Sequence, residues 1–144
     1  MNLMKKLLIG LFALFVFTGC SDISTVKTAT LEFDKSISVG DAFEKYKYFK
    51  STKWSDLETD NGKKVVQVNC EIDFDKHPSG TEWKANLNSM SVVVQFTINK
   101  DDTFQISYYG LETVAKNGEK AEHKTNILQM NTFLKELYAN TPLS

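Results

Sequence analysis

The side chains that could supply nucleophilic catalysis in this chain are two cysteines and two histidines. Hydrolytic catalysis requires a nucleophile, a base and an orienting group in contact. The sequence has no G-x-S-x-G turn, and His77 and His123 both lie in predicted polar connections. Cys70 is in step with the apolar residues of an alternating strand, where a thiol behaves as a small buried hydrophobe. We therefore expect no catalytic residue and a structural role for Cys70.

A second chemical candidate is the segment Asp73-Phe-Asp75-Lys-His77, which places three possible metal ligands at alternate positions. Carboxylates alone suit calcium or magnesium, and an added imidazole favours zinc or another transition metal. Pro78 interrupts the strand geometry that would keep the three side chains on one face. The sequence also lacks a second cluster of cysteine and histidine. We expect solvated carboxylates here, with no metal and no cofactor.

The other cysteine, Cys20, ends an N-terminal segment with the layout of an export signal. Two lysines precede an apolar run over residues 7–17, and small residues follow it. The tetrapeptide FTGC at residues 17–20 resembles the lipobox of bacterial lipoproteins. This resemblance implies cleavage between Gly19 and Cys20. It also implies that the acylated Cys20 anchors the chain in a lipid bilayer.

Other functions for this apolar run fit less well. The run has eleven residues, whereas a membrane-spanning helix needs about 20. It cannot be extended, because the chain turns polar from Ser21 onwards. An amphipathic surface helix is disfavoured because the run is apolar on every face. Phe17 departs from the aliphatic residue usual at this lipobox position, so a conventional secretory signal remains the alternative.

The residue after the acylated cysteine bears on the destination of a lipoprotein. In lipoproteins of bacteria with two membranes, Asp at this position is the familiar signal for retention in the inner membrane. The resemblance therefore implies that Ser21 permits delivery to the outer membrane, in a cell that has one. One acyl chain binds a bilayer only marginally, whereas two or more hold a protein firmly.

The composition of the chain argues against a nucleic-acid partner and for a single domain without a disulfide. The chain contains no arginine, and without Lys5 and Lys6 its net charge would be about −3. Nucleic-acid binding is therefore not expected. Acylation of Cys20 would leave Cys70 without a disulfide partner. We expect a cleaved signal peptide over residues 1–19, a lipidated tether over 20–30, and one domain over 31–144.

Four large side chains are candidates for contact with a partner. Tyr48 projects from the polar face of a predicted helix, and Trp83 lies in a polar loop over residues 75–86. Tyr109 and Leu111 are predicted on the outer face of the sheet, where an exposed apolar strip would mark a partner surface. Two alternatives remain open: the N-terminal segment covers the outer face, and Trp83 folds back as a lid on the core.

The remaining pattern predicts an α+β domain. Ser38 and Asp41 form a capping box before an amphipathic helix of about ten residues, and Thr125 caps a final helix that ends near Ala139. Alternation and Asn-Gly turns predict strands over about 26–33, 51–59, 66–74, 87–98 and 103–114. We expect a two-layer domain in which both helices pack on one face of a four- or five-stranded antiparallel sheet. The order of elements is similar to that of cystatin-like folds, a likeness that carries no function.

These observations predict location better than activity. The segment over residues 38–74 resembles small uncharacterised envelope lipoproteins of bacteria and carries no catalytic residue. We expect a membrane-anchored lipoprotein that acts as a non-catalytic protein-binding or accessory module, such as an inhibitor, an assembly factor or an adhesin. The alternative is a small-ligand-binding protein or an enzyme with a pocket between helices and sheet, where Tyr108, His77 and Trp83 would meet.

Overall fold

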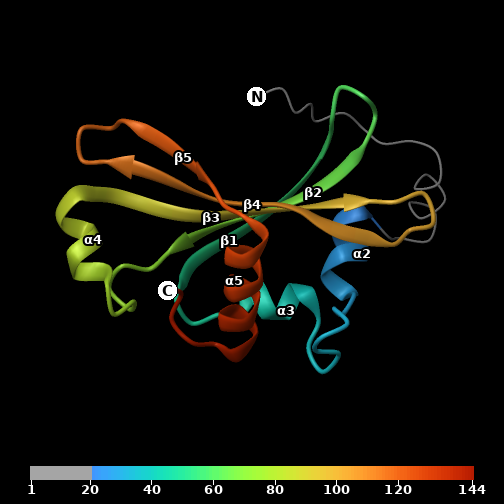
Figure 1. The fold of residues 1–144 in the computed structure, drawn as a ribbon, viewed down its shortest axis with the longest axis horizontal. Coiled ribbons are helices and arrows are strands. Elements are labelled where there is room, and N and C mark those ends of the chain that lie inside the picture. Colours follow the sequence, from blue (N-terminus) through green and yellow to red (C-terminus); the bar gives the residue numbers. More distant parts are fainter. Residues whose placement is uncertain (1–20) are drawn as a thin grey trace.

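The computed structural model describes residues 21–144 as five antiparallel strands and four helices (Figure 1). The strands follow one another across the sheet in chain order, β1-β2-β3-β4-β5. The predicted α+β class and antiparallel sheet are confirmed. The predicted signal peptide over 1–19 and the proposed lipidation site Cys20 lie outside the described residues. Within residues 21–144, no helix has the length and hydrophobicity needed to cross a membrane.

Four of the strands lie close to the predicted ranges, and the predicted alternation of side chains holds except where β4 contains a bulge. Their bounds are β1 Phe49–Glu58, β2 Lys64–Ile72, β3 Leu87–Ile98, β4 Phe104–Ala115 and β5 Lys120–Lys124. Both predicted Asn-Gly turns are present, with positive φ angles of 83° at Gly62 and 89° at Gly118. The fifth strand is therefore β5, after the second turn, and not the predicted strand over residues 26–33.

The helices are α2 Asp22–Thr28, α3 Val39–Glu44, α4 Gly80–Asn86 and α5 Ile127–Ala139. Helices α2, α3 and α5 lie on one side of the sheet, and α4 lies at the end of the sheet opposite α2 (Figure 1). The sheet face towards α3 and α5 is apolar from Val66 to Ile72 on β2 and from Val92 to Ile98 on β3. Its buried side chains are Val66, Val68, Cys70, Ile72, Val92, Val94, Phe96 and Ile98.

The segment after Cys20 is folded, which corrects the predicted tether over residues 20–30 and the predicted strand over 26–33. Ser21 caps α2 by accepting a hydrogen bond from the Ser24 amide at 3.0 Å. Ile23 and Val26 are three residues apart and share one helical face, and Val26 is completely buried in the core. The folded body therefore includes residues 21–30 as well as residues 31–144.

Helix α3 begins where predicted and is shorter than predicted. The Ser38 hydroxyl accepts a hydrogen bond from the Asp41 amide at 3.1 Å. The helix ends at Glu44 after six residues. Phe49 already belongs to β1, because it pairs with Ile72 at the beginning of the β1–β2 ladder.

Strand β4 contains a bulge that changes which side chains face the core. Gln95 pairs with Tyr108 and Phe96 pairs with Ile106, so Ser107 is the extra residue. An extra residue reverses the alternation of side chains beyond it. The core face of β4 therefore carries Phe104, Ile106, Tyr109 and Leu111, all of which pack against the core.

Candidate binding groove

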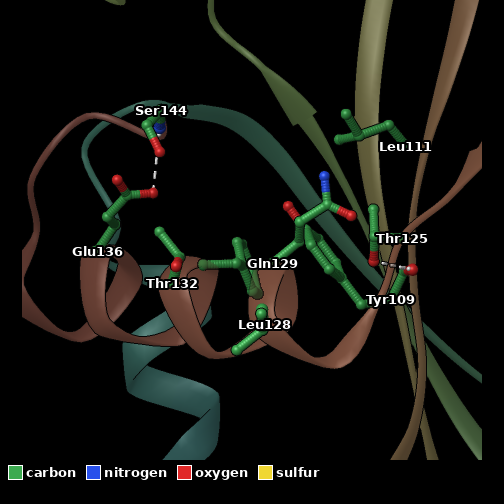
Figure 2. Close-up of a pocket in the computed structure, with 9 residues that line it drawn as sticks. Tyr109, Leu111, Thr125, Leu128, Gln129, Thr132, Glu136 and Ser144 are labelled. Carbon is green, nitrogen blue, oxygen red and sulfur yellow. Dashed lines mark hydrogen bonds between the residues drawn. The ribbon is translucent and has the colours of Figure 1, made fainter.

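A groove of 310 Å³ lies between α5 and the sheet (Figure 2). Its walls come from β4, from the connection after β5, from α5 and from the C-terminus. The lining residues are Tyr109, Leu111, Thr125, Leu128, Gln129, Thr132, Phe133, Glu136 and Ser144. The groove therefore combines an aromatic floor with hydroxyl, amide and carboxylate groups.

The floor of the groove is built by the bulge in β4. Tyr109 pairs with the buried Val94 and so faces α5, where its ring stacks on Phe133 at 4.5 Å between centroids. Leu111 shares this face. The prediction that Tyr109 and Leu111 form an exposed strip on the outer sheet face is therefore wrong. Burial raises the pKa of the Tyr109 hydroxyl to about 12, so this group stays neutral.

Helix α5 is fixed at its start by side-chain caps. The Asn126 side chain accepts from the Gln129 amide at 2.8 Å, and the Gln129 side chain accepts from the Asn126 amide at 3.0 Å. The cap is therefore Asn126, one residue after the predicted Thr125. The Thr125 hydroxyl instead donates to the Tyr109 carbonyl at 2.7 Å, which ties the helix start to β4 (Figure 2).

The start of α5 exposes two apolar side chains, and one of them, Leu128, lines the groove. Leu128 is 72% exposed at the groove mouth, and the adjacent Ile127 is 67% exposed. Two adjacent residues point about 100° apart on a helix. With Ile127 and Leu128 both apolar, the apolar face at the start of α5 is too wide for the sheet to cover entirely.

The far end of the groove is closed by the C-terminus. The Ser144 amide donates to the Glu136 carboxylate at 3.0 Å (Figure 2). The preceding residues are held by side chains from distant parts of the chain. The Tyr46 hydroxyl donates to the Thr141 carbonyl at 2.6 Å, and Leu143 is buried in the core. Residues 141–144 therefore form a fixed wall of the groove.

Two of the predicted contact residues, Tyr48 and Trp83, lie away from the groove and pack on His77. The ring centroids are 5.5 Å apart for Tyr48 and His77, and 4.4 Å apart for His77 and Trp83. Both aromatic rings are half-buried against the core. The alternative in which Trp83 folds back on the core therefore describes the structure. Tyr108 does not join them, because its hydroxyl donates to Glu122 on β5 at 2.7 Å.

The histidine in this cluster has a structural environment. His77 is 6% exposed, and its Nδ1 accepts a hydrogen bond from the Ser79 amide at 3.0 Å. In the neutral ring the proton therefore resides on Nε2, which donates to the Leu143 carbonyl at 2.9 Å. Both ring nitrogens are hydrogen-bonded to the backbone, and His77 lines none of the described cavities.

The segment that carries Trp83 was predicted as a loop and contains helix α4. The helix begins at Gly80, which packs directly on the Phe74 carbonyl. A β-carbon at Gly80 would lie 1.6 Å from that oxygen, a distance no side chain can adopt. Formation of α4 depends on the close packing of the Gly80 backbone against the Phe74 backbone. This contact cannot be inferred from the local sequence, in which Pro78 and Gly80 indicate only a turn.

The three candidate metal ligands are separated by their own contacts. Asp73 accepts from the Asp75 amide at 3.0 Å, and Asp75 forms an ion pair with Lys84 at 2.6 Å. The hydrogen bond and charge of Lys84 hold the pKa of Asp75 below its ordinary range. Among residues 21–144, no three Asp, Glu, His or Cys side chains lie close enough together to hold a metal ion.

Cys70 lies in the middle of the buried sheet face as a free cysteine. Its side chain is fully buried, and burial raises the thiol pKa to about 12. At neutral pH the thiol is therefore protonated and shielded from solvent, which makes it a poor nucleophile. The two histidines have other partners: His77 contacts Leu143, and His123 contacts Thr113 at 3.3 Å.

Comparisons of this chain with protein-family models, with curated proteins and with solved structures find no match.

Proposed function

We propose that this chain is a lipid-anchored protein of the bacterial envelope that binds another envelope protein, and that the groove beside α5 is the binding site. The observation that carries the proposal is Leu128, which is 72% exposed at the mouth of an aromatic-floored groove. Protein interfaces combine a buried apolar centre with a polar rim. An apolar side chain of the partner would contact Leu128 and Leu111, while Gln129 and Thr132 supply hydrogen bonds at the rim.

A second candidate, binding of a small molecule, is favoured by the dimensions of the same groove. Small-molecule pockets have volumes of about 300–1,000 Å³, and this groove measures 310 Å³. It also lies between a helix and the sheet, with hydroxyl and amide groups from Thr125, Gln129 and Thr132. The protein partner is preferred because Leu128 faces outward. A small ligand bound in the groove would leave this side chain exposed to water.

The lipid anchor is the part of the proposal that concerns location. The FTGC motif supports acylation of Cys20, and Ser21 supports delivery to the outer membrane of a cell with two membranes. The proposed partners are thus a lipid bilayer, through acylated Cys20, and one envelope protein. A binding role is also consistent with the described surroundings of Cys70 and His77, which are packed and hydrogen-bonded for structure.

Replacing Cys20 by serine is expected to move the protein from the membrane fraction to the soluble fraction, because a serine hydroxyl cannot receive the thioether-linked lipid. The measurement is fractionation of cells expressing Cys20→Ser or wild-type chain, followed by immunoblotting. Cys70→Ser is the matched control and should remain in the membrane fraction, since the Cys70 thiol is buried. Membrane retention of Cys20→Ser would contradict the anchor.

A photo-crosslinking amino acid at position 128 is expected to give one discrete adduct in intact cells, because this side chain stands at the groove mouth. Position 131 is the matched control, since Asn131 is exposed on the same helix and does not line the groove. An adduct of protein mass at 128 and none at 131 supports the protein partner. A small-mass adduct at 128 supports the ligand candidate instead. No adduct at 128, or equal adducts at both positions, contradicts binding in the groove.

A further inference from the structure

The described fold begins almost immediately after the proposed lipidation site. Only Ser21 separates Cys20 from Asp22, the first residue of α2. Two residues of extended chain span at most about 7 Å. If Cys20 carries the anchor, as the proposed function states, the body of the protein therefore starts within about 7 Å of the acylated residue.

Helix α2 is held rigidly to the rest of the body, so it cannot act as a tether. The Lys27 side chain forms an ion pair with Glu44 of α3 at 2.8 Å. The backbone of Gly40 in α3 approaches so closely that an added β-carbon would lie 3.0 Å from the Lys27 carbonyl. The Ala29 carbonyl, just after α2, accepts from the Val39 amide at 2.8 Å.

The start of α2 lies at one particular end of the sheet. The charged groups that act on Asp22 are Lys64 at the start of β2, Asp56 near the end of β1, and Asp102 in the β3–β4 turn. The β1–β2 and β3–β4 turns therefore lie at the same end as the α2 start, and this is the right-hand end in Figure 1. We name residues 59–63 and 99–103, which form these two turns, the anchor-side tip.

We infer that the anchor-side tip rests against the lipid headgroups and that the α5 groove is held away from the membrane. Each headgroup layer is about 5–8 Å thick, comparable with the reach of Ser21 from the acylated cysteine. The tip must then lie at headgroup level, and the short connection restricts tumbling of the domain. This orientation rests on acylation of Cys20 and deepens the proposed function by stating which surface faces lipid.

The chemistry of the tip fits contact with headgroups and not insertion into hydrocarbon. Its exposed residues include Asp60, Lys63, Lys100 and Asp101, charges of both signs, and it carries none of the exposed large hydrophobic residues among residues 21–144. Lysine ammonium groups pair with lipid phosphates, and charged groups are costly in the bilayer core. A zwitterionic headgroup layer, which offers both charges, therefore matches this surface.

The register of the sheet gives the height of the groove above the tip. Phe104 pairs with Ile98 at the anchor-side end, and Leu111 pairs with Val92. At about 3.3 Å per residue, the six-residue step from Ile98 to Val92 places Leu111 about 20 Å from the tip. A groove at this height clears the headgroups and stays accessible to an envelope protein.

The orientation can be tested with the acylated protein, purified from membranes and reconstituted into phosphatidylcholine vesicles that contain a few mole per cent of a nickel-chelating lipid. Spin labels are attached at Lys100→Cys on the tip and, in a second variant, at Asn117→Cys in the β4–β5 turn. The two sites are separated by the length of β4, about 36 Å. The buried Cys70 thiol is not labelled.

Headgroup nickel is expected to relax the label at position 100 at least about fivefold more strongly than the label at 117, given this separation. A control inserts five Gly-Ser pairs after Ser21, so that a serine still precedes Asp22 and α2 keeps its cap. This flexible linker spans about 17 Å and should make the two labels nearly equal. Equal relaxation without the insertion, or stronger relaxation at 117, would overturn the orientation. Failure of the protein to float with the vesicles would instead contradict the anchor itself.

Discussion

Replacing Phe43 by alanine is expected to lower the free energy of unfolding by about 3–5 kcal/mol. The Phe43 ring is 1% exposed and joins the two layers of the fold. Its centroid lies 5.8 Å from Trp54 on β1, 6.2 Å from Phe96 on β3 and 6.1 Å from Phe133 on α5. Truncation would leave a cavity where α3, α5 and the sheet meet. No disulfide compensates, because Cys70 is a free cysteine.

The measurement is urea unfolding of the purified protein, monitored by tryptophan fluorescence, since Trp54 contacts the substituted ring. Phe33→Ala is the matched control. Phe33 is 53% exposed and, among the described residues, has one ring contact, with Tyr138 at 4.8 Å, so its loss should cost less than about 1 kcal/mol. Domains of this size have total stabilities of about 5–15 kcal/mol. A Phe43→Ala protein as stable as Phe33→Ala would show that α3 does not join the sheet to α5.

The hairpins were the most predictable part of the fold, because their signals are local. Asn-Gly turns permit positive φ angles, and the alternation on either side sets which residues face the core. Strand β3 was predicted over residues 87–98, which are its bounds in the structure. These predictions needed no knowledge of what the strand packs against.

Elements that depend on tertiary contact were predicted less well. Helix α2 has seven residues and buries only Asp22 and Val26, so its apolar pattern is too sparse to separate a helix from a strand. Helix α4 relies on backbone contact between Gly80 and Phe74. Neither contact is visible in local composition, and short helices have little stability of their own.

The candidate groove was missed for a more specific reason. Tyr109 and Leu111 were singled out from the sequence, but a strict two-residue period placed them on the wrong face. The apolar residues of β4 do carry the signal of the bulge, since the spacing from Ile106 to Tyr109 is three and not two. Leu128 was also recoverable, because it follows another large apolar residue at the start of a helix.

Asp22 is a described carboxyl group whose burial affects the pH dependence of stability between acidic and neutral pH. Its side chain is 3% exposed, and neither carboxylate oxygen has a hydrogen-bond partner among the described residues. Burial is the main cause that raises its pKa from 3.8 to about 6. The positive charge of Lys64 opposes this shift, whereas Asp56 and Asp102 add to it. The ionised form of Asp22 therefore destabilises the folded state.

The sign of the pH dependence follows from the raised pKa. Between pH 3.8 and about 6 the folded protein binds this proton more tightly than the unfolded chain does. The stabilisation by the protonated form is complete below pH 3.8 and is lost as pH rises through about 6. A carboxyl pKa raised from 3.8 to about 6 corresponds to roughly 3 kcal/mol. Asp22→Asn, which is neutral at every pH, should therefore stabilise the protein by about 2–3 kcal/mol at pH 8 and by little at pH 4.

Urea unfolding of wild type and Asp22→Asn at pH 4 and pH 8 measures how the substitution changes the free energy of unfolding at each pH. Asp60→Asn is the control: the same change in the exposed β1–β2 turn should leave stability within about 0.5 kcal/mol at both pH values. A pH-independent gain for Asp22→Asn would mean that the amide makes new hydrogen bonds, and that the carboxylate charge is not the cause. A loss of stability at pH 8 would show that Asp22 is held as a stabilising anion, and would remove the desolvation cost inferred from its burial.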